Sequence, residues 1–101
     1  MKTIWKFPIS DNKNYRNYVI HIVPMPIGAD ILHIALDPTG ELCLWAKVES
    51  DSSVQNYKIH CIGTGADCTS SPYWNYIGTV NEGPFVWHFF AEDVKVRGVY
   101  K

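Results

Sequence analysis

The stretch from residue 29 to residue 50 constrains the fold more than any other, because it has the pattern of a β-hairpin. Two segments with alternating apolar residues flank residues 37–40 (DPTG). The proline suits the second position of a type I turn, and the glycine can adopt the left-handed conformation that closes a three-residue hairpin loop. We therefore expect Asp37 to lie opposite Glu41.

This loop length fixes the register of the two strands. The cross-strand pairs that it predicts are Ile31–Lys47, His33–Trp45 and Ala35–Cys43. One side of the hairpin then becomes uniformly apolar, and consists of Leu32, Ile34, Leu36, Leu42, Leu44, Ala46 and Val48. A two-residue loop would slip the register by one residue and move every side chain to the opposite face. The pattern thus predicts a core face and a mixed face that carries His33, Cys43 and Trp45.

The remaining chain indicates further strands, and no segment has a convincing helical period. Strand patterns cover residues 2–7, 18–23, 54–64, 74–80 and 84–91, with a weaker one in the polar tail after residue 92. Pro24 and Pro26 lack the N–H donors of a strand ladder, so this segment should be an edge or a connector. Short strands separated by turns about every ten residues predict an all-β fold. We expect a single domain over residues 1–101, built as a small antiparallel sandwich or partly open barrel of six to seven strands.

Composition excludes several classes of protein. The chain is 47% hydrophobic and 19% charged, which argues against disorder. Its formal net charge of −1 lacks the basic footprint of a broad nucleic-acid binder. There is no apolar run of the roughly 18 residues that a transmembrane helix needs, and the alternating start is unlike a signal peptide. An odd count of three cysteines favours a reducing cytoplasm over a secreted disulfide scaffold.

Several motifs together resemble those of one protein family. They are MKTIWKF at residues 1–7, MPIGADIL at 25–32, LWA at 44–46, GTG at 63–65, YIGT at 76–79 and VWHFF at 86–90. In this order they resemble a family of short, functionally uncharacterised proteins common in tailed phages and prophages. The loop at residues 10–17 and the tail after Ala91 look longer than in that family. The resemblance implies a viral protein in the host cytoplasm and supplies no catalytic residues to transfer.

Metal and catalytic signatures are absent from the sequence pattern. All four histidines fall on predicted strands, without the clustered Cys and His spacing of a zinc site. His60 and Cys61 are neighbours, but successive strand residues point to opposite faces. Cys68 and the hydroxyls beside it lack the context of an activated nucleophile, and no paired carboxylates occur. We therefore predict no metal, no cofactor and no catalytic residues, although an unrecognised enzyme stays an alternative.

Ligand-binding features concentrate in the loop at residues 64–73 and the aromatic residues that follow it. The loop is long and rich in glycine and hydroxyls, which can offer donors to a phosphate, and aromatic rings can stack on a base. The candidate ligand-binding residues are Thr64, Gly65, Thr69, Ser70, Tyr73, Trp74 and Tyr76, completed by Trp45 or by Tyr15 and Arg16 of a neighbouring chain. The alternative is that the loop is a plain connector and that its aromatic neighbours are core residues.

These observations favour a non-enzymatic phage-type protein that captures a small nucleotide-like ligand, as a counter-defence that sequesters a host immune signal. A protein-binding inhibitor or adaptor that acts on a host or phage protein is the second hypothesis. We also expect a homo-oligomer, because residues 85–90 (FVWHFF) place apolar side chains on both strand faces. Neither broad nucleic-acid binding nor membrane association is expected.

Overall fold

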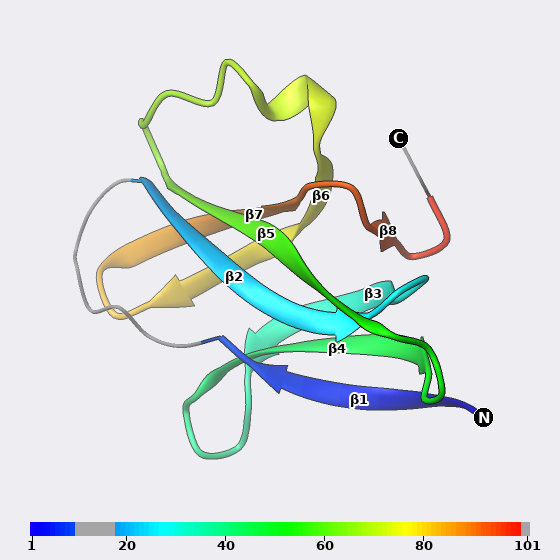
Figure 1. The fold of residues 1–101 in the computed structure, drawn as a ribbon. Coiled ribbons are helices and arrows are strands. Elements are labelled where there is room, and N and C mark those ends of the chain that lie inside the picture. The colour runs from blue at the N-terminus through cyan, green and yellow to red at the C-terminus, as the bar shows by residue number, and fades with distance from the viewer. Residues whose placement is uncertain (10–17, 100–101) are drawn as a thin grey trace.

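The computed structural model describes residues 1–9 and 18–99 and consists of two sheets packed face to face (Figure 1). The predicted all-β sandwich is confirmed, and the sheets do not close into a barrel. Its elements are β1 (Lys2–Pro8), β2 (Tyr18–Pro26), β3 (Asp30–Leu36), β4 (Leu42–Glu49), β5 (Val54–Gly63), the 3₁₀ turn η1 (Ser71–Tyr73), β6 (Asn75–Glu82), β7 (Phe85–Ala91) and β8 (Lys95–Val96).

Each sheet has four strands, and the strand orders show which segments are edges. Sheet A has the order β1-β4-β3-β8, and sheet B has the order β2-β5-β7-β6. The segment from Pro24 to Pro26 continues β2 instead of breaking it, and β2 is an edge strand, where the missing donors of proline are tolerated. All pairings are antiparallel except that of β8, which runs parallel to β3 through Asp30–Lys95 and Ile31–Val96.

The hairpin of β3 and β4 has the predicted loop and, over most of its length, the predicted register. The amide of Asp37 donates to the carbonyl of Glu41 at 2.7 Å, and the pairs His33–Trp45 and Ala35–Cys43 are confirmed. Leu44 is completely buried, as its place on the core face requires.

One predicted pair is wrong. The register shifts between Ile31 and His33, so Ile31 pairs with Ala46 instead of Lys47. This β-bulge places an extra residue, Leu32, in the strand and turns Ile31 into the core. Strict alternation of apolar residues gives no sign of a bulge, so the sequence pattern did not predict this one.

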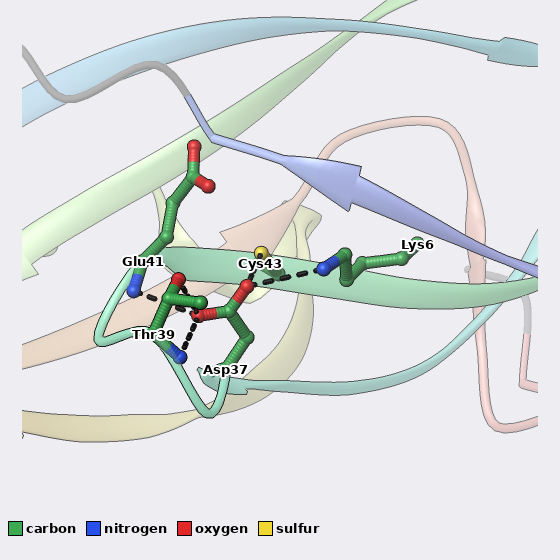
Figure 2. A network of polar contacts seen from close by, with 5 residues as sticks. All are labelled: Lys6, Asp37, Thr39, Glu41 and Cys43. Carbon is green, nitrogen blue, oxygen red and sulfur yellow. Dashed lines mark hydrogen bonds and ion pairs between the residues drawn. The ribbon is translucent and has the colours of Figure 1, made fainter.

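The hairpin loop is closed by the buried carboxylate of Asp37 (Figure 2). It accepts hydrogen bonds from the Thr39 amide at 2.8 Å, the Thr39 hydroxyl at 2.6 Å and the Glu41 amide at 2.9 Å. The ammonium group of Lys6 lies 3.1 Å from its other oxygen and ties β1 to the loop. These donors, foremost the Thr39 hydroxyl, hold the pKa of the Asp37 carboxyl well below its usual range.

The core lies between the sheets and depends on one close approach. Its fully buried side chains include Met25, Ile31, Leu44, Ile59 and Phe89. Where β6 crosses β3, a Cβ added to Gly78 would lie 3.1 Å from Cγ2 of Ile34. At this contact between the sheets, a residue larger than glycine would require Ile34 to shift.

Candidate aromatic pocket on sheet B

The outer face of sheet B, which points away from the core, is rich in aromatic and histidine side chains. A row of pairs crosses the sheet from Ile20 to His60, to Phe90 and to Tyr76. The whole face carries Tyr18, Ile20, Ile22, Lys58, His60, Ile62, His88, Phe90, Tyr76 and Thr79. Lysine is the one ordinarily charged residue in this set, so the face is suited to apolar and stacking contacts.

Trp74 follows η1 and lies over this face, stacked on His60. The two ring centroids are 3.6 Å apart and the planes differ by 10°. His60 is only 3% exposed, and both ring nitrogens are bonded: Nδ1 to the Tyr18 hydroxyl at 2.5 Å and Nε2 to the Glu92 carboxylate at 2.8 Å. Burial, together with the nearby Glu92 charge, raises the pKa of the Tyr18 hydroxyl. Tyr18 therefore stays protonated and anchors the ring against which Trp74 packs.

A second histidine network lies on the same face. His88 Nε2 is 2.7 Å from the Thr64 hydroxyl, and Nδ1 is 2.9 Å from the Thr79 hydroxyl. The Thr79 hydroxyl is hydrogen-bonded in turn to the Tyr76 hydroxyl. Four polar side chains, from β6, β7 and the turn after β5, thus form one continuous chain of hydrogen bonds that ends at an aromatic residue.

A pocket of about 370 Å³ adjoins these aromatic residues. Its wall contains the rings of Trp74, Tyr76 and Phe90, two valines, and the polar residues Ser71, Asn75 and Arg97. The three rings support one another, because the Phe90 centroid lies 6.2 Å from that of Trp74 and 5.4 Å from that of Tyr76. The volume falls at the lower end of the roughly 300–1,000 Å³ typical of small-molecule sites.

Arg97 is held at the pocket by both its backbone and its side chain. It adopts a left-handed conformation with φ of 49°, which is unusual for a residue with a side chain. Its amide donates to the Ile31 carbonyl at 2.7 Å, and its guanidinium donates to the carbonyls of Ile77 at 2.8 Å and Tyr76 at 3.3 Å. The strained backbone is therefore stabilised by contacts to both sheets, and it fixes a cation at the edge strand β6.

Neighbouring contacts hold the segment that carries Arg97. The amide of Gly98 donates to the Asp30 carboxylate at 2.8 Å. The buried Asn75 side chain donates to the carbonyl of Val94 at 2.9 Å. The C-terminal side of the pocket thus depends on side chains from β3 and β6.

The structure brings together two of the predicted ligand-binding residues. Trp74 and Tyr76 both line the pocket. Thr64 does not line it, but belongs to the hydrogen-bond chain that ends at Tyr76. Trp45 lies on sheet A, beside His33 with ring centroids 6.1 Å apart, and is not part of the pocket wall.

The other predicted residues serve the geometry of the loop. Gly65 has a φ of 91° in a turn, and Thr69 donates from its amide to the Asp67 carboxylate at 3.0 Å. Ser70 accepts the Tyr73 amide at the start of η1, and the Tyr73 residue is 80% exposed. Arg16 and Tyr15 lie outside the described residues.

Sequence reasoning missed Arg97, Asn75, Ser71 and Phe90 as members of one site. The only available sign was that Arg97 is one of just two arginines in the chain. Its place beside Tyr76 follows from the parallel pairing of β8 with β3, and such a distant pairing leaves no local pattern.

One group of side chains on sheet A has the composition of a metal site. Asp37, Glu41 and Cys43 can bring ligand atoms within 4.8 Å of one another. The Asp37 carboxylate is already bonded to three donors and to Lys6, and Figure 2 shows the Glu41 carboxylate directed away from it. Burial raises the pKa of the Cys43 thiol, which opposes the thiolate form that binds metals. The group acts as a closure of the hairpin loop.

Comparison with known families places the chain. Residues 1–98 match DUF7352, a domain of unknown function, and the protein belongs to this family. No curated protein and no solved structure matches it.

The three cysteines are free thiols. The described part of the chain has no helix that is long and apolar enough to cross a membrane.

Proposed function

We propose that this DUF7352 protein is a non-enzymatic binding protein whose pocket takes a small nucleotide-like ligand. The observation that carries this proposal is the presence of Arg97 in the same pocket as Trp74, Tyr76 and Phe90. An aromatic wall offers a surface on which a base stacks, and an arginine offers a fork of N–H donors that matches a phosphate. The pocket volume of about 370 Å³ suits one nucleotide unit.

The electrostatics of the site support binding of a single anionic ligand. Two guanidinium nitrogens of Arg97 each donate to one carbonyl, and a guanidinium has five N–H donors in all. Arg97 fixes positive charge at the pocket, whereas Lys58 and Glu92 add one charge of each sign to the outer face of sheet B. A long polyanion would need charges spread along its path.

The Tyr18–His60–Glu92 contacts have the connectivity of a nucleophile, a base and an orienting acid, so an enzyme is a relevant alternative. A nucleophilic tyrosine would need a lowered hydroxyl pKa, yet the pKa of Tyr18 is raised. This difference favours a structural role for the three residues and a binding role for the site.

The biological setting that we propose follows from the resemblance to phage proteins. A phage protein with such a pocket would act in the host cytoplasm and sequester a nucleotide-like immune signal of the host. Sequestration needs only affinity and abundance, and it requires no catalytic machinery.

A protein-binding inhibitor or adaptor is the second candidate, and a specific surface favours it. Ile20 and Ile22 lie on the edge strand β2 and are 45% and 54% exposed. Exposed apolar side chains beside a neutral sheet face are typical of contact sites. Ile20 and Ile22 also support the proposed homo-oligomer, whereas Phe90, on which that expectation partly rested, is contacted by Trp74 and Tyr76 of its own chain. Light scattering that gives 11.5 kDa at tens of micromolar protein would remove the oligomer.

Calorimetric titration with mono-, di- and cyclic nucleotides tests the main proposal. We expect saturable binding of at least one class, and at least a tenfold loss in Arg97→Lys, which keeps the charge but not the fork. Lys95→Ala is the matched control, since Lys95 lies two residues earlier on β8 and does not line the pocket. Absence of saturable binding up to millimolar nucleotide would leave the protein-binding candidate in its place.

A further inference from the structure

The free edges of the two sheets differ in how they are protected. A sheet edge presents unpaired backbone N–H and C=O groups, and proteins block such edges with prolines, bulges, very short strands or covering groups. Among the described residues, the edge strands are β1 and β8 of sheet A and β2 and β6 of sheet B. Three of these edges carry such a device, and β1 carries none of them before Pro8.

Prolines block the edge of β2. The Ile27 amide donates to the Ser53 carbonyl at 2.8 Å, in the register that pairs β2 with β5. In an antiparallel pair, alternate residues direct their backbone groups to the partner strand, so the odd-numbered residues of β2 face β5. Pro24 and Pro26 therefore stand where an N–H group would point to the free edge.

The edges of β6 and β8 are blocked in other ways. The register of β6 shifts between Tyr76 and Gly78, which is a bulge in an edge strand. The Arg97 guanidinium donates to the carbonyls of Tyr76 and Ile77 and so occupies acceptors of this strand. β8 consists of two residues and is too short an edge for a further strand.

β1 is a regular strand of seven residues at the border of sheet A (Figure 1). The Ser50 amide donates to the Met1 carbonyl and the Ile9 amide to the Leu42 carbonyl, both at 2.9 Å. Both bonds continue the register of β1 with β4, so the odd-numbered residues of β1 direct their backbone groups to β4. The residues whose N–H and C=O groups therefore point to the free edge are Lys2, Ile4 and Lys6.

The side chains along this edge leave apolar surface on both faces of β1. Ile4, on the outer face of sheet A, is 58% exposed. Trp5 points to the opposite face, lies beside Phe7 with ring centroids 6.3 Å apart, and is 39% exposed. Because side chains alternate along a strand, an added strand would cover Ile4 with one set of its side chains and Trp5 with the other.

The charges at this edge favour an acidic occupant. Three lysines share the outer face of sheet A here: Lys2, Lys6 and Lys47. The carboxylates beside them already accept other donors, and belong to Asp30, Asp37 and Glu49. Lys6 is one of the donors to Asp37, but its side chain stays 46% exposed. Among the described residues, Lys2 and Lys47 form no ion pair.

A second copy of the chain fits this edge less well. Two β1 strands paired antiparallel about Ile4 would set Lys2 of each copy opposite Lys6 of the other, and like charges directly opposite destabilise a sheet. A shift of the register by two residues keeps the edge groups paired, but it still gathers both lysines of each copy on one face.

We infer that the free edge of β1 binds an extended acidic segment of a partner protein, which joins sheet A as an additional strand. In antiparallel pairing, acidic residues of the segment lie opposite Lys2 and Lys6, and an apolar residue lies opposite Trp5. The backbone groups supply affinity and the side chains supply the choice of partner. The site lies on sheet A, so it does not depend on the pocket of sheet B.

Amide hydrogen exchange tests the edge without a ligand. The amides of Ile4 and Lys6 should exchange at least about tenfold faster than those of Trp5 and Phe7, because only the latter are bonded to β4. Equal rates for the four amides would overturn the inference, since the edge would then be occupied or β1 would not be paired as described.

The binding experiment uses a blocked peptide with the sequence Ser-Glu-Val-Thr-Val-Glu-Ser. When its threonine lies opposite Ile4, its two glutamates lie opposite Lys6 and Lys2. Titration followed by amide NMR should show saturable shifts along β1 and slower exchange of the Ile4 amide. Replacement of both glutamates by lysine should weaken binding about tenfold. Absence of saturable binding up to millimolar peptide would overturn the inference.

Two methylated peptides provide a matched control for strand addition. A methyl group on the nitrogen of the threonine removes a donor aimed at β1 and should weaken binding about tenfold. The same change at a neighbouring valine, whose N–H points away from β1, should weaken it less than about twofold. Equal losses for the two peptides would show that the peptide does not pair as a strand.

Variants of the protein locate the site. Ile4→Pro removes an N–H group that points to the free edge and should abolish binding, whereas Ile22→Pro makes the same change on β2 and should leave it intact. Lys2→Glu keeps the backbone and should narrow the preference for the glutamate peptide over the lysine peptide. Unchanged binding in Ile4→Pro, or an unchanged preference in Lys2→Glu, would contradict the assigned edge. A wild-type dimer that Ile4→Pro converts to a monomer would assign the edge to a second copy and overturn the inference.

Discussion

Both sheets carry polar networks at their surface, but the network on sheet A ends differently from the two on sheet B. At the hairpin loop of sheet A, the Asp37 carboxylate is surrounded by donors from its own loop and from Lys6. On sheet B, the two histidine networks each end at an aromatic residue of the pocket, Trp74 or Tyr76. A network that closes on itself contributes stability, whereas one that ends at a pocket wall also holds an aromatic residue of that wall in place.

The largest expected effect is on the core that both sheets share. Leu44→Ala should lower the free energy of unfolding by about 2–5 kcal/mol, since it empties a completely buried position. Leu36→Ala, on the same predicted face but 38% exposed, is the control and should cost far less. Chemical denaturation measures both. Similar losses for the two variants would contradict the assigned core face.

Gly78→Ala tests the contact that joins the sheets. The new methyl group would meet Ile34 at 3.1 Å, so overpacking should cost about 1–3 kcal/mol. Ile34→Ala removes the Cγ2 methyl group at the contact, and the double variant should lose less than the sum of the two single losses. A double variant whose losses simply add would show that the two residues do not press on each other.

Acid should weaken the closed network of sheet A specifically. The folded state lowers the pKa of Asp37, so this carboxylate stabilises the protein above the pKa of an unfolded aspartate. That stability is lost as the pH falls through the range below about 4. Unfolding of the wild type and of Asp37→Asn should therefore differ most at neutral pH and converge in acid. Glu82→Gln, at an exposed site, should run parallel to the wild type.

Two isosteric substitutions, one in the polar network of each sheet, test most directly whether the networks differ in role. Thr39→Val removes a hydroxyl that bonds Asp37 and should cost about 1 kcal/mol of stability while nucleotide affinity is unchanged. Thr79→Val, in the network that ends at Tyr76, should change stability by less than about 0.5 kcal/mol and lower nucleotide affinity instead. Thermal unfolding and calorimetric titration of both variants check this. If Thr39→Val changed nucleotide affinity and Thr79→Val lowered stability instead, the two networks would not have the roles assigned to them.

Local chemistry was readable from the sequence and distant pairing was not. The hairpin loop followed from a proline and a glycine at fixed positions, and the strands followed from alternation. The bulge at Leu32 broke that alternation, and Ile31 beside it is completely buried in the core. Likewise, β8 confirms the weak strand pattern in the tail, but its parallel pairing with β3 lay outside the antiparallel expectation.

The candidate site was predicted only where its members are close in the chain. Trp74 and Tyr76 were identified because they follow a long loop of small residues, and both line the pocket. Arg97 supplies the cation that was expected from Arg16, and it reaches the pocket through a left-handed turn that no residue pattern announces. Trp45 was grouped with them by residue type, although strand order places it on the other sheet.

The hydrogen bonds from Gly98 to Asp30 and from Arg97 to Ile31 affect the order in which the protein folds during its synthesis on the ribosome. The two partners of the first contact are 68 residues apart, and Arg97 and Gly98 are among the last described residues to emerge. Strands β1 to β7 emerge before this segment, but the wall that holds Arg97 cannot be assembled, nor β8 added to sheet A, until the segment leaves the exit tunnel. Contacts between such distant residues form slowly, because the intervening chain must first be ordered. Binding competence should therefore be acquired only after strands β1 to β7 have emerged.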